Sequence, residues 1–367
     1  MACLVESGLK GCDFLRNLFI RESGNYKTSY KNDMKLFRTT GAKISMIIIV
    51  AIILLFPLFI SNYIIGLLTL CAIASIGAIG LNILTGFTGQ ISLGVGAFLG
   101  VGGYTSAILT STHGLSFWIA LPLAGLLTAI VGGLFGLPSL RLKGLYLAIA
   151  TLAAQVIILF IISRWDGLTG GTAGMVLNRP NVAGFSFSSN TSYYYLCVII
   201  LLLTTLYAVN LVRTRTGRSF LAVRDRDVAA QIMGINIFKT KFLAFAISSF
   251  FVGIAGALLA HYTMIVSPEL YSIQVSIQYL AMILVGGLGS VFGSILGAIF
   301  ITLLPVGLSS SIDMLAAFMP DMYQLLSAFK EFVFGGVIIL FLIFEPHGLA
   351  HIWLNIKKYF KLYPFSY

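Results

Sequence analysis

The stretch NILTGFTGQISLG, residues 82–94, contains several uncharged polar side chains that could bind a solute. Asn82, Gln90 and Ser92 lie there among glycines, inside a strongly apolar region. Lipid offers no hydrogen bonds, so a backbone that breaks at these glycines must be satisfied by protein or by water in a cavity. The stretch therefore predicts either the lining of a polar path or hydrogen bonds between helices, since Ser, Thr and Gln often bond across membrane helices.

A similar polar segment, SPELYSIQVS at 267–276, lies in the second half of the chain. Pro268 breaks the helical pattern there, because proline lacks the N–H that a helix needs. Gln274 and Ser276 then hold the places that Gln90 and Ser92 hold in the first segment. We expect the two segments to line one translocation path together, with interhelical bonding as the alternative.

The sequence lacks the usual groups of an enzyme or of an ion-driven pump. Its 12 acidic residues all lie outside the apolar segments or at their ends, whereas intramembrane carboxylates usually carry proton or cation coupling. His347 and His351 are four residues apart, with no third metal ligand near them. The phosphate-loop pattern GxxxxGK followed by Ser or Thr is missing too. We therefore expect no catalytic residue, metal or cofactor in this chain, and an energy source that belongs to a partner.

The segment 213–241, RTRTGRSFLAVRDRDVAAQIMGINIFKTK, is an island of charge between two apolar runs. It carries seven of the 23 basic residues and two of the 12 acidic ones. Apolar residues recur at helical spacing over 220–236, which predicts a short amphipathic helix that ends near Gly234. Arg224, Asp225, Arg226 and Asp227 are expected to project away from the apolar positions, which are Leu221, Val228, Ile232 and Ile235.

Two kinds of partner suit this helix. Anionic lipid would attract its arginines, but two aspartates stand within the basic run. Mixed charges, together with the small side chains of Ala229 and Ala230, suit a groove on another protein better. The pattern therefore favours docking to a protein partner.

The composition places these groups in a polytopic helical membrane protein. Of 367 residues, 58% are hydrophobic and 10% are charged, and the mean hydropathy is +0.99. A soluble domain cannot bury that much apolar surface, and the 38 glycines suit closely packed transmembrane helices. The net charge of +11 indicates cytoplasmic loops rather than a nucleic-acid partner. We predict an all-α fold in a lipid bilayer.

Apolar segments of about 20 residues predict about ten transmembrane helices, with both the N- and the C-terminus cytoplasmic. On this topology the cytoplasmic segments hold 20 of the 23 basic residues, and only Arg164, Arg179 and Lys330 lie outside. This bias agrees with the accumulation of Lys and Arg on cytoplasmic loops. The ten segments are 44–62, 64–84, 94–111, 117–137, 145–163, 192–212, 242–262, 274–289, 291–310 and 331–345.

The same topology divides the chain into three parts. Residues 1–43 are expected to form a disordered cytoplasmic tail, 44–350 the transmembrane domain, and 351–367 a cytoplasmic C-terminal tail. The charged island at 213–241 becomes the main cytoplasmic loop of the transmembrane domain.

The longest outer loop, 165–191, opens with WDGLTGGTAGM. Its glycines suit a compact loop to which a soluble partner comes close. Trp165 and Asp166 are the candidate contacts for that partner. A plain connector between two spans is the alternative.

A repeat relates the two halves of the chain. With an offset of 184 residues, QISLGVGAFLGVGGYTS (90–106) matches QVSIQYLAMILVGGLGS (274–290) at seven of 17 positions. In the ten-helix topology the first copy follows a helix that runs inward, and the second follows one that runs outward. The two repeats are therefore predicted to be inverted, as in many transporters with a central substrate path.

The chain resembles the branched-chain amino acid permease family of ABC transporters, in its LivM-type membrane subunit. VAAQIMG (228–234) is similar to the core of the loop by which ABC importer permeases engage their ATPases, although Val228 stands where an acidic residue is usual. Val95 replaces a common histidine, and His347 a common arginine. The matching stretches follow the family order from about 60 to 350: GLNILTGFTGQISLGVGAFLGVGGYTSAIL, RLKGLYLAIATLA, WDGLTGGTAGM, GRSFLAVRDRDVAAQIMGIN, HYTMIVSPELYS, ILVGGLGSVFGSILGA and FEPHGL.

The resemblance implies a subunit of a bacterial inner-membrane importer for leucine, isoleucine and valine. It also implies a second homologous permease, two ATPase subunits that bind ATP and Mg, and a periplasmic substrate-binding protein. Urea or another small polar solute, carried by the same family, remains an alternative, as does an ion-coupled secondary transporter. The residues expected to couple the chain to the ATPases are Arg224, Asp225, Asp227, Ala229, Ala230 and Gly234.

Overall fold

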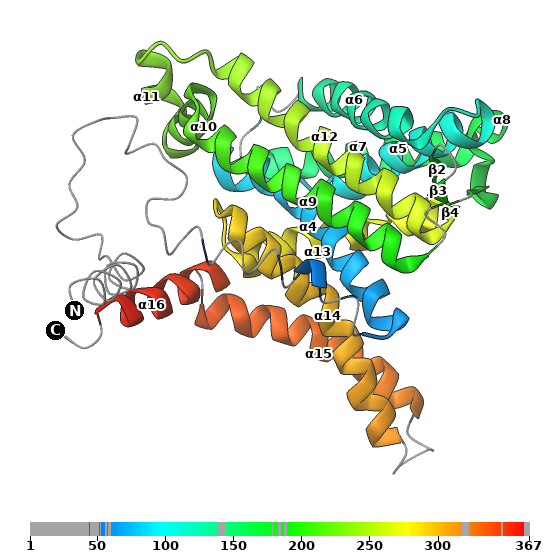
Figure 1. Ribbon diagram of the computed structural model, residues 1–367. Coiled ribbons are helices and arrows are strands. Elements are labelled where there is room, and N and C mark those ends of the chain that lie inside the picture. The colour runs from blue at the N-terminus through cyan, green and yellow to red at the C-terminus, as the bar shows by residue number, and fades with distance from the viewer. Residues whose placement is uncertain are drawn as a thin grey trace, which may run out of the picture. The chain divides into compact units, whose positions relative to one another are not determined.

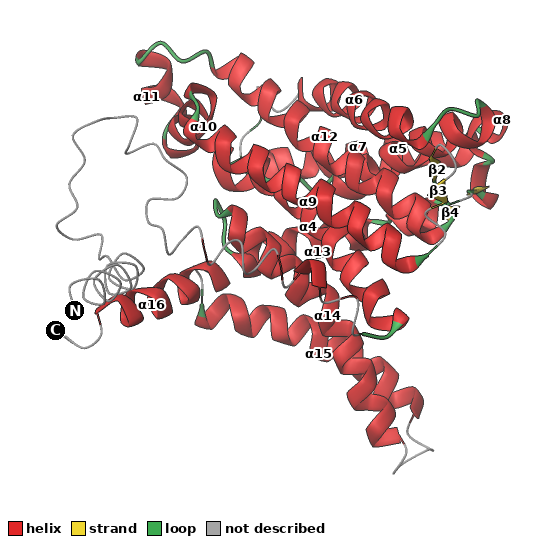
Figure 2. Ribbon diagram, in the orientation of Figure 1, coloured by secondary structure: helices red, strands yellow, loops and turns green. Residues whose placement is uncertain are grey.

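The computed structural model describes residues 60–137, 144–177, 189–316, 323–345 and 348–362, with the shorter pieces 44, 51, 53–55, 57, 142, 179–182 and 185–186. The described part is almost entirely helical (Figure 2). The predicted tail 1–43, most of the predicted helix 44–62 and His347 lie outside it. The chain divides into two compact units, residues 1–62 with 356–367 and residues 63–355. The second unit contains all the candidate site residues.

Long apolar helices make up most of this unit (Figure 1). A helix satisfies its own backbone hydrogen bonds, which lipid requires of any spanning segment. Within the described residues, seven helical segments are long and apolar enough to cross a membrane. They are α4 (Asn62–Thr88), α6 (Phe117–Gly136), α7 (Leu145–Arg164), α9 (Asn190–Arg213), α12 (Ile237–Thr263), the run of η5 (Pro268–Tyr271) into α13 (Ile273–Gly286), and α14 (Val291–Ala316).

Two further predicted spans coincide with helices that differ from the expectation. α5 (Val95–Ala107) is short and continues into a π-helical turn, η2 (Ile108–Thr112). α15 (Tyr323–Phe344) begins before the predicted start at 331, so Lys330 and Glu331 lie inside the helix rather than at its end. Its apolar part, Phe332–Phe341, starts directly after this charged pair. The count of ten spans and the cytoplasmic placement of both termini stay predictions.

The outer loop, 165–191, is built from short helices and short paired strands. It contains α8 (Asp166–Thr169), η4 (Gly171–Ala173) and β1 (Met175–Val176). β1 pairs antiparallel with β4 (Ile265–Val266), with Met175 opposite Val266, which joins the loop to the end of α12. A second small hairpin pairs β2 (Asn181–Val182) with β3 (Phe185–Ser186). Three further helices, α10 (Arg215–Asp225), α11 (Asp227–Ile232) and α16 (Leu349–Leu362), complete the described elements.

Glycine permits the closest helix contacts in the core. α12 packs against α5 and α6, and α13 packs against α14. A Cβ on Gly102 of α5 would overlap the Gly253 backbone of α12, and one on Gly256 would overlap the backbone of Leu99. Small residues at such crossings let membrane helices approach closely. This contact explains part of the glycine content of the chain.

The two copies of the predicted repeat occupy different places in their helices. α5 begins at Val95, whose counterpart at the offset of 184 is Tyr279, in the middle of α13. Gly103 lies inside α5, whereas its counterpart Gly287 follows the end of α13 with a φ of +114°. The inverted repeat therefore stays a prediction.

Candidate functional site

The charged loop contains two short helices rather than one. α10 and α11 meet at Arg226, whose extended backbone (φ −156°, ψ 110°) interrupts the helix. The expectation of one continuous helix over 220–236 is therefore wrong, and the chain bends at residues 225–227, here named the elbow. The Arg226 N–H donates to the Ala222 carbonyl of α10, and the Arg226 carbonyl accepts from Ala230 of α11. One residue thus ends the first helix and starts the second.

Gly234 ends α11, the second helix of the charged loop, as expected. It adopts a φ of +82°, in the left-handed region that favours glycine. An added Cβ would meet no other atom there, so the backbone conformation alone requires glycine. The interpretation of Gly234 as a helix terminator agrees with this geometry.

An ion pair joins the start of α11 to α12. The Lys241 ammonium donates to a carboxylate oxygen of Asp227 at 3.0 Å. The side chains of Lys241 and Asp227 are only 6% and 17% exposed. A charge held so far from water needs its partner, because an unpaired buried charge is costly. The pair therefore fixes the first turn of α11 against the first turns of α12.

Arg224, in α10 directly before the elbow, joins the charged loop to the end of α4. Its Nη1 donates to the Gly86 carbonyl at 2.9 Å, and its aliphatic stem passes directly over Gly89. The same nitrogen lies next to Gly289, in the turn between α13 and α14. On the outer side, Nε of Arg224 meets the exposed carboxylate of Asp225 at 3.4 Å. Two separate membrane segments therefore contact one arginine of the charged loop.

Asn82 bonds α4 to that same turn. Its amide nitrogen donates to the Ser290 carbonyl at 2.9 Å and to the Ser294 hydroxyl at 2.6 Å. Its amide oxygen accepts from the Gly289 N–H at 3.0 Å. These are the bonds that the alternative of interhelical bonding requires. A role for Asn82 in a path stays a prediction.

Ser276 lies in a second buried network, which includes a residue that the sequence interpretation missed. Its hydroxyl donates to Oε1 of Gln155 in α7 at 2.5 Å and accepts from the Gly96 N–H of α5 at 2.7 Å. Nε2 of Gln155 donates in turn to the Tyr271 carbonyl at 3.2 Å. The signal for Gln155 was available, because it is a lone amide inside an apolar span.

The other three predicted path residues differ in their surroundings. Ser92 is buried, and its hydroxyl accepts from the Gly94 N–H at 3.3 Å. Gln274 is exposed near the start of α13. Gln90 is buried, but neither end of its amide has a hydrogen-bond partner among the residues that the structure describes. Within this described part of the chain, the five residues do not form one cluster of shared contacts.

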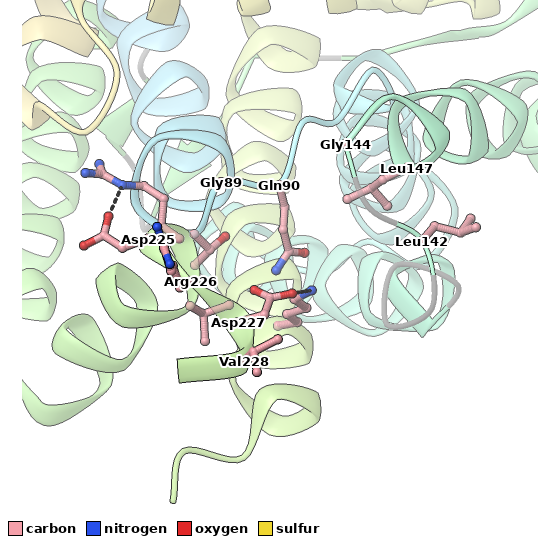
Figure 3. A pocket seen from close by; sticks show the side chains of 13 residues that line it. Gly89, Gln90, Leu142, Gly144, Leu147, Asp225, Arg226, Asp227 and Val228 are labelled. Atoms are coloured by element: carbon pink, nitrogen blue, oxygen red, sulfur yellow. Dashed lines mark hydrogen bonds and ion pairs between the residues drawn. The ribbon is translucent and has the colours of Figure 1, made fainter. Parts of the chain in front are cut away.

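A pocket of about 450 Å³ lies between Gln90 and the elbow. Figure 3 shows the Gln90 side chain directed from the segment after α4 toward the elbow, where Asp227 lies. The start of α7 forms another wall. The pocket therefore brings a predicted path residue next to the predicted coupling residues. Its lining residues are Thr88, Gly89, Gln90, Leu142, Gly144, Leu147, Val223, Arg224, Asp225, Arg226, Asp227, Val228 and Lys241.

The outer side of α11 presents apolar side chains. Val228, Ile232 and Met233 are 66%, 81% and 82% exposed, and we name them the exposed apolar turn. Ala230 is buried on the inner side, whereas Ala229 faces outward with the turn. Val228 and Ile232 belong to the apolar face that the sequence pattern predicted, whereas Met233 does not, and the structure leaves all three exposed. An uncovered apolar turn on a polar loop is typical of an interaction site.

The candidate residues of the outer loop lie at its beginning. Trp165 is 57% exposed, and Asp166 opens α8 with its side chain exposed. The Thr169 hydroxyl donates back to the carbonyls of Ile162 and Trp165, at 2.6 and 2.9 Å, which keeps the loop compact. The geometry leaves Trp165 and Asp166 accessible, and their contact with a partner stays a prediction.

Comparison with known proteins identifies the family. Residues 63–342 match the family model described as branched-chain amino acid transport system / permease component. This chain belongs to that family. The match includes every candidate site residue, from Asn82 to Ser276. Together with the long apolar helices, membership makes the chain a multi-pass membrane permease subunit.

Curated relatives are named as permeases either for branched-chain amino acids or for a sugar. The high-affinity branched-chain amino acid transport system permease protein LivM of Salmonella typhimurium is 32% identical over 338 residues, 85% of this chain and 75% of the relative. The probable branched-chain amino acid transport permease protein LivH of Methanocaldococcus jannaschii is 29% identical, over 77% and 90%. The ribose import permease protein RbsC of Haemophilus influenzae is 31% identical, over 70% and 81%. No solved structure matches the chain.

Proposed function

We propose that this chain is the membrane-spanning permease subunit of an ATP-driven importer of branched-chain amino acids. The family and the names of the LivM and LivH relatives support this substrate class. The importer would lie in the inner membrane of a bacterium and accept its solute from a periplasmic binding protein. Because relatives named LivM and relatives named LivH both match, a second homologous permease would share the membrane with this one. ATP and Mg would be bound by two separate ATPase subunits.

The exposed apolar turn carries the proposal. Its side chains are uncovered, while Arg224 and Asp227 hold the base of the same loop against the membrane helices. A docking element needs both properties, because it must bind a partner and must transmit that partner's motion. The ATPases would cover the turn, and the mixed charges around it would select the partner's surface.

The contacts of the elbow suggest how motion would pass into the membrane. ATP binding would close the ATPases and move α11. The Lys241–Asp227 pair would pass this movement to α12, and Arg224 would pass it to α4 and to the α13–α14 turn. The helices would then open the path to each side of the membrane alternately. Ala229 on the outer face would allow close approach of the partner.

Copurification of the ATPases with variants of the permease tests the docking role. Ile232→Ser removes an 81% exposed apolar side chain from the turn. Covering such a side chain contributes about 1.5–3 kcal/mol, so the affinity for the ATPases should fall about tenfold or more. Val176→Ser removes a 77% exposed apolar side chain from β1 of the outer loop and should leave ATPase copurification unchanged. Equal copurification of both variants would exclude the turn as the docking site.

Uptake into vesicles that contain the assembled transporter tests the substrate class and the energy source. Radiolabelled leucine should enter only when ATP and Mg are present on the side of the ATPases. Ribose is the matched comparison, because a ribose permease is among the relatives. Uptake of ribose in place of leucine would overturn the substrate class and leave the family intact. Leucine uptake driven by an ion gradient, without ATP, would favour the secondary transporter instead.

A further inference from the structure

The pocket beside the elbow contains a polar side chain that the described part of the chain does not satisfy. Gln90 is 4% exposed, and both its Nε2 and its Oε1 lack a hydrogen-bond partner among the described residues. Burial of unpaired polar groups opposes folding, so buried amides are normally bonded. Because Gln90 lines the pocket (Figure 3), a ligand there that accepts from and donates to the amide would account for the residue.

The elbow supplies a positive charge on the opposite wall. Arg226 has no ion-pair partner among the residues that the structure describes. The Asp225 carboxylate is turned to Arg224, at 3.4 Å, and its side chain is 71% exposed. Lys241 and Asp227 face each other at 3.0 Å. The pocket thus offers a guanidinium to an anionic group, and Oε1 of Gln90 to a cationic one.

Apolar side chains complete the lining. Leu142 contributes from the segment before α7 and Leu147 from its first turn, and Val223 and Val228 contribute from α10 and α11. The volume of about 450 Å³ lies within the usual range for small-molecule sites. A ligand that fits this combination has a carboxylate, an ammonium group and a small aliphatic part.

We propose that this pocket binds a free α-amino acid with an aliphatic side chain. The Arg226 guanidinium holds its carboxylate, while Oε1 of Gln90 accepts from its ammonium group. Leu142 and Leu147 contact its aliphatic part. This site rests on the proposed function, because the ligand is then the transported solute itself. A bound amino acid bridges the segment after α4 and the elbow, so its affinity depends on the position of the coupling loop.

Equilibrium binding of tritiated L-leucine to the assembled transporter in nanodiscs tests the site, without ATP and without the binding protein. Arg226→Gln should weaken leucine binding about tenfold or more, since a hydrogen bond to a charged group is lost. Gln90→Leu should also weaken binding. Leucinamide lacks the carboxylate and 4-methylpentanoate lacks the ammonium group, so each should compete at least about tenfold more weakly than leucine. Ribose, which lacks both charges, should not compete.

Arg218→Gln is the matched control, because Arg218 is an exposed arginine of α10 outside the pocket. It should bind leucine as the unchanged transporter does. Unaltered leucine affinity in both Arg226→Gln and Gln90→Leu would overturn the site, whereas ATP-driven leucine uptake into vesicles that contain the same variants would still support the proposed function. Absence of leucine uptake from the unchanged transporter would overturn the function instead, and with it the identity of the ligand.

Discussion

Removing the charge of Lys241 should loosen α11 without unfolding the membrane helices. Lys241→Met keeps the length and the apolar stem of the side chain but leaves the Asp227 carboxylate without its bond at 3.0 Å. Asp227 is only 17% exposed, so water replaces the lost partner poorly. Arg224 separately joins the charged loop to the Gly86 carbonyl at the end of α4. Opening of α11 should therefore become easier.

The size of the effect follows from the burial of the pair. Breaking a buried ion pair by removal of one partner costs about 3–5 kcal/mol. Because Asp227 keeps some access to water, we take the lower end, about 3 kcal/mol. At 1.4 kcal/mol per factor of ten, the opening equilibrium of α11 should rise about a hundredfold.

Hydrogen exchange measured by mass spectrometry on the full chain in nanodiscs reports this opening. The amides of Ala230 and Met233, which donate to Arg226 and Ala229, should exchange about a hundredfold faster in Lys241→Met, because exchange follows local opening. Lys239→Met is the control, since Lys239 is an exposed lysine two residues earlier in α12. Its exchange should match that of the unchanged chain.

The double variant Lys241→Met with Asp227→Asn separates the effect of a buried charge from that of a lost contact. With both charges removed, exchange in α11 should be slower than in Lys241→Met alone, since the buried carboxylate charge is gone as well. Two results would refute this reasoning. One is an increase of less than about threefold in Lys241→Met, far below the value expected for a buried pair. The other is faster exchange in the double variant than in the single one.

Three further predictions concern stability in detergent, measured as the midpoint of thermal unfolding. Asn82→Leu should lower the midpoint, because Ser290, Ser294 and Gly289 lose their shared partner, at a cost of about 1–3 kcal/mol; a midpoint equal to that of the exposed variant Gln274→Leu would contradict this. Gln155→Leu should lower the midpoint by a similar amount, since Ser276 and the Tyr271 carbonyl lose their partner; no change would show that the network contributes nothing. Gly102→Ala should destabilise the α5–α12 contact, whereas Gly335→Ala, whose Cβ would meet no atom, should raise stability by about 0.5–1 kcal/mol; equal effects would refute the packing argument.

Much of the fold could be predicted because membrane helices obey a local rule. A long apolar segment must form a helix in lipid whatever its neighbours are, so the segments around 117–137, 145–163 and 192–212 coincide with α6, α7 and α9. The start of α15 could not be predicted this way. The charged residues Lys330 and Glu331 marked the start of the predicted span, but a helix can continue through charged residues beyond its apolar part.

The candidate site was predictable in position and not in its contacts. The charges of the loop, its alanines and its terminating Gly234 are local signals, and they placed a short helical segment between two apolar helices, where α10 and α11 lie between α9 and α12; its coupling role stays a prediction. The break at Arg226 is not local in the same sense. Arg224, before the break, bonds to the Gly86 carbonyl, 138 residues away along the chain. Asp227, after the break, bonds to Lys241, 14 residues away.

The sequence by itself determined the class of this protein: its apolar periods, its basic loops, its lack of a phosphate loop and its family motifs depend only on which residues are present and in what order. The tertiary structure alone decided which polar residues are satisfied. Asn82 and Ser276 find partners in other helices, whereas the buried amide of Gln90, beside a pocket, has no partner among the described residues. A hydrogen bond forms over about 3 Å, and only the packing of helices distant in sequence brings two groups that close.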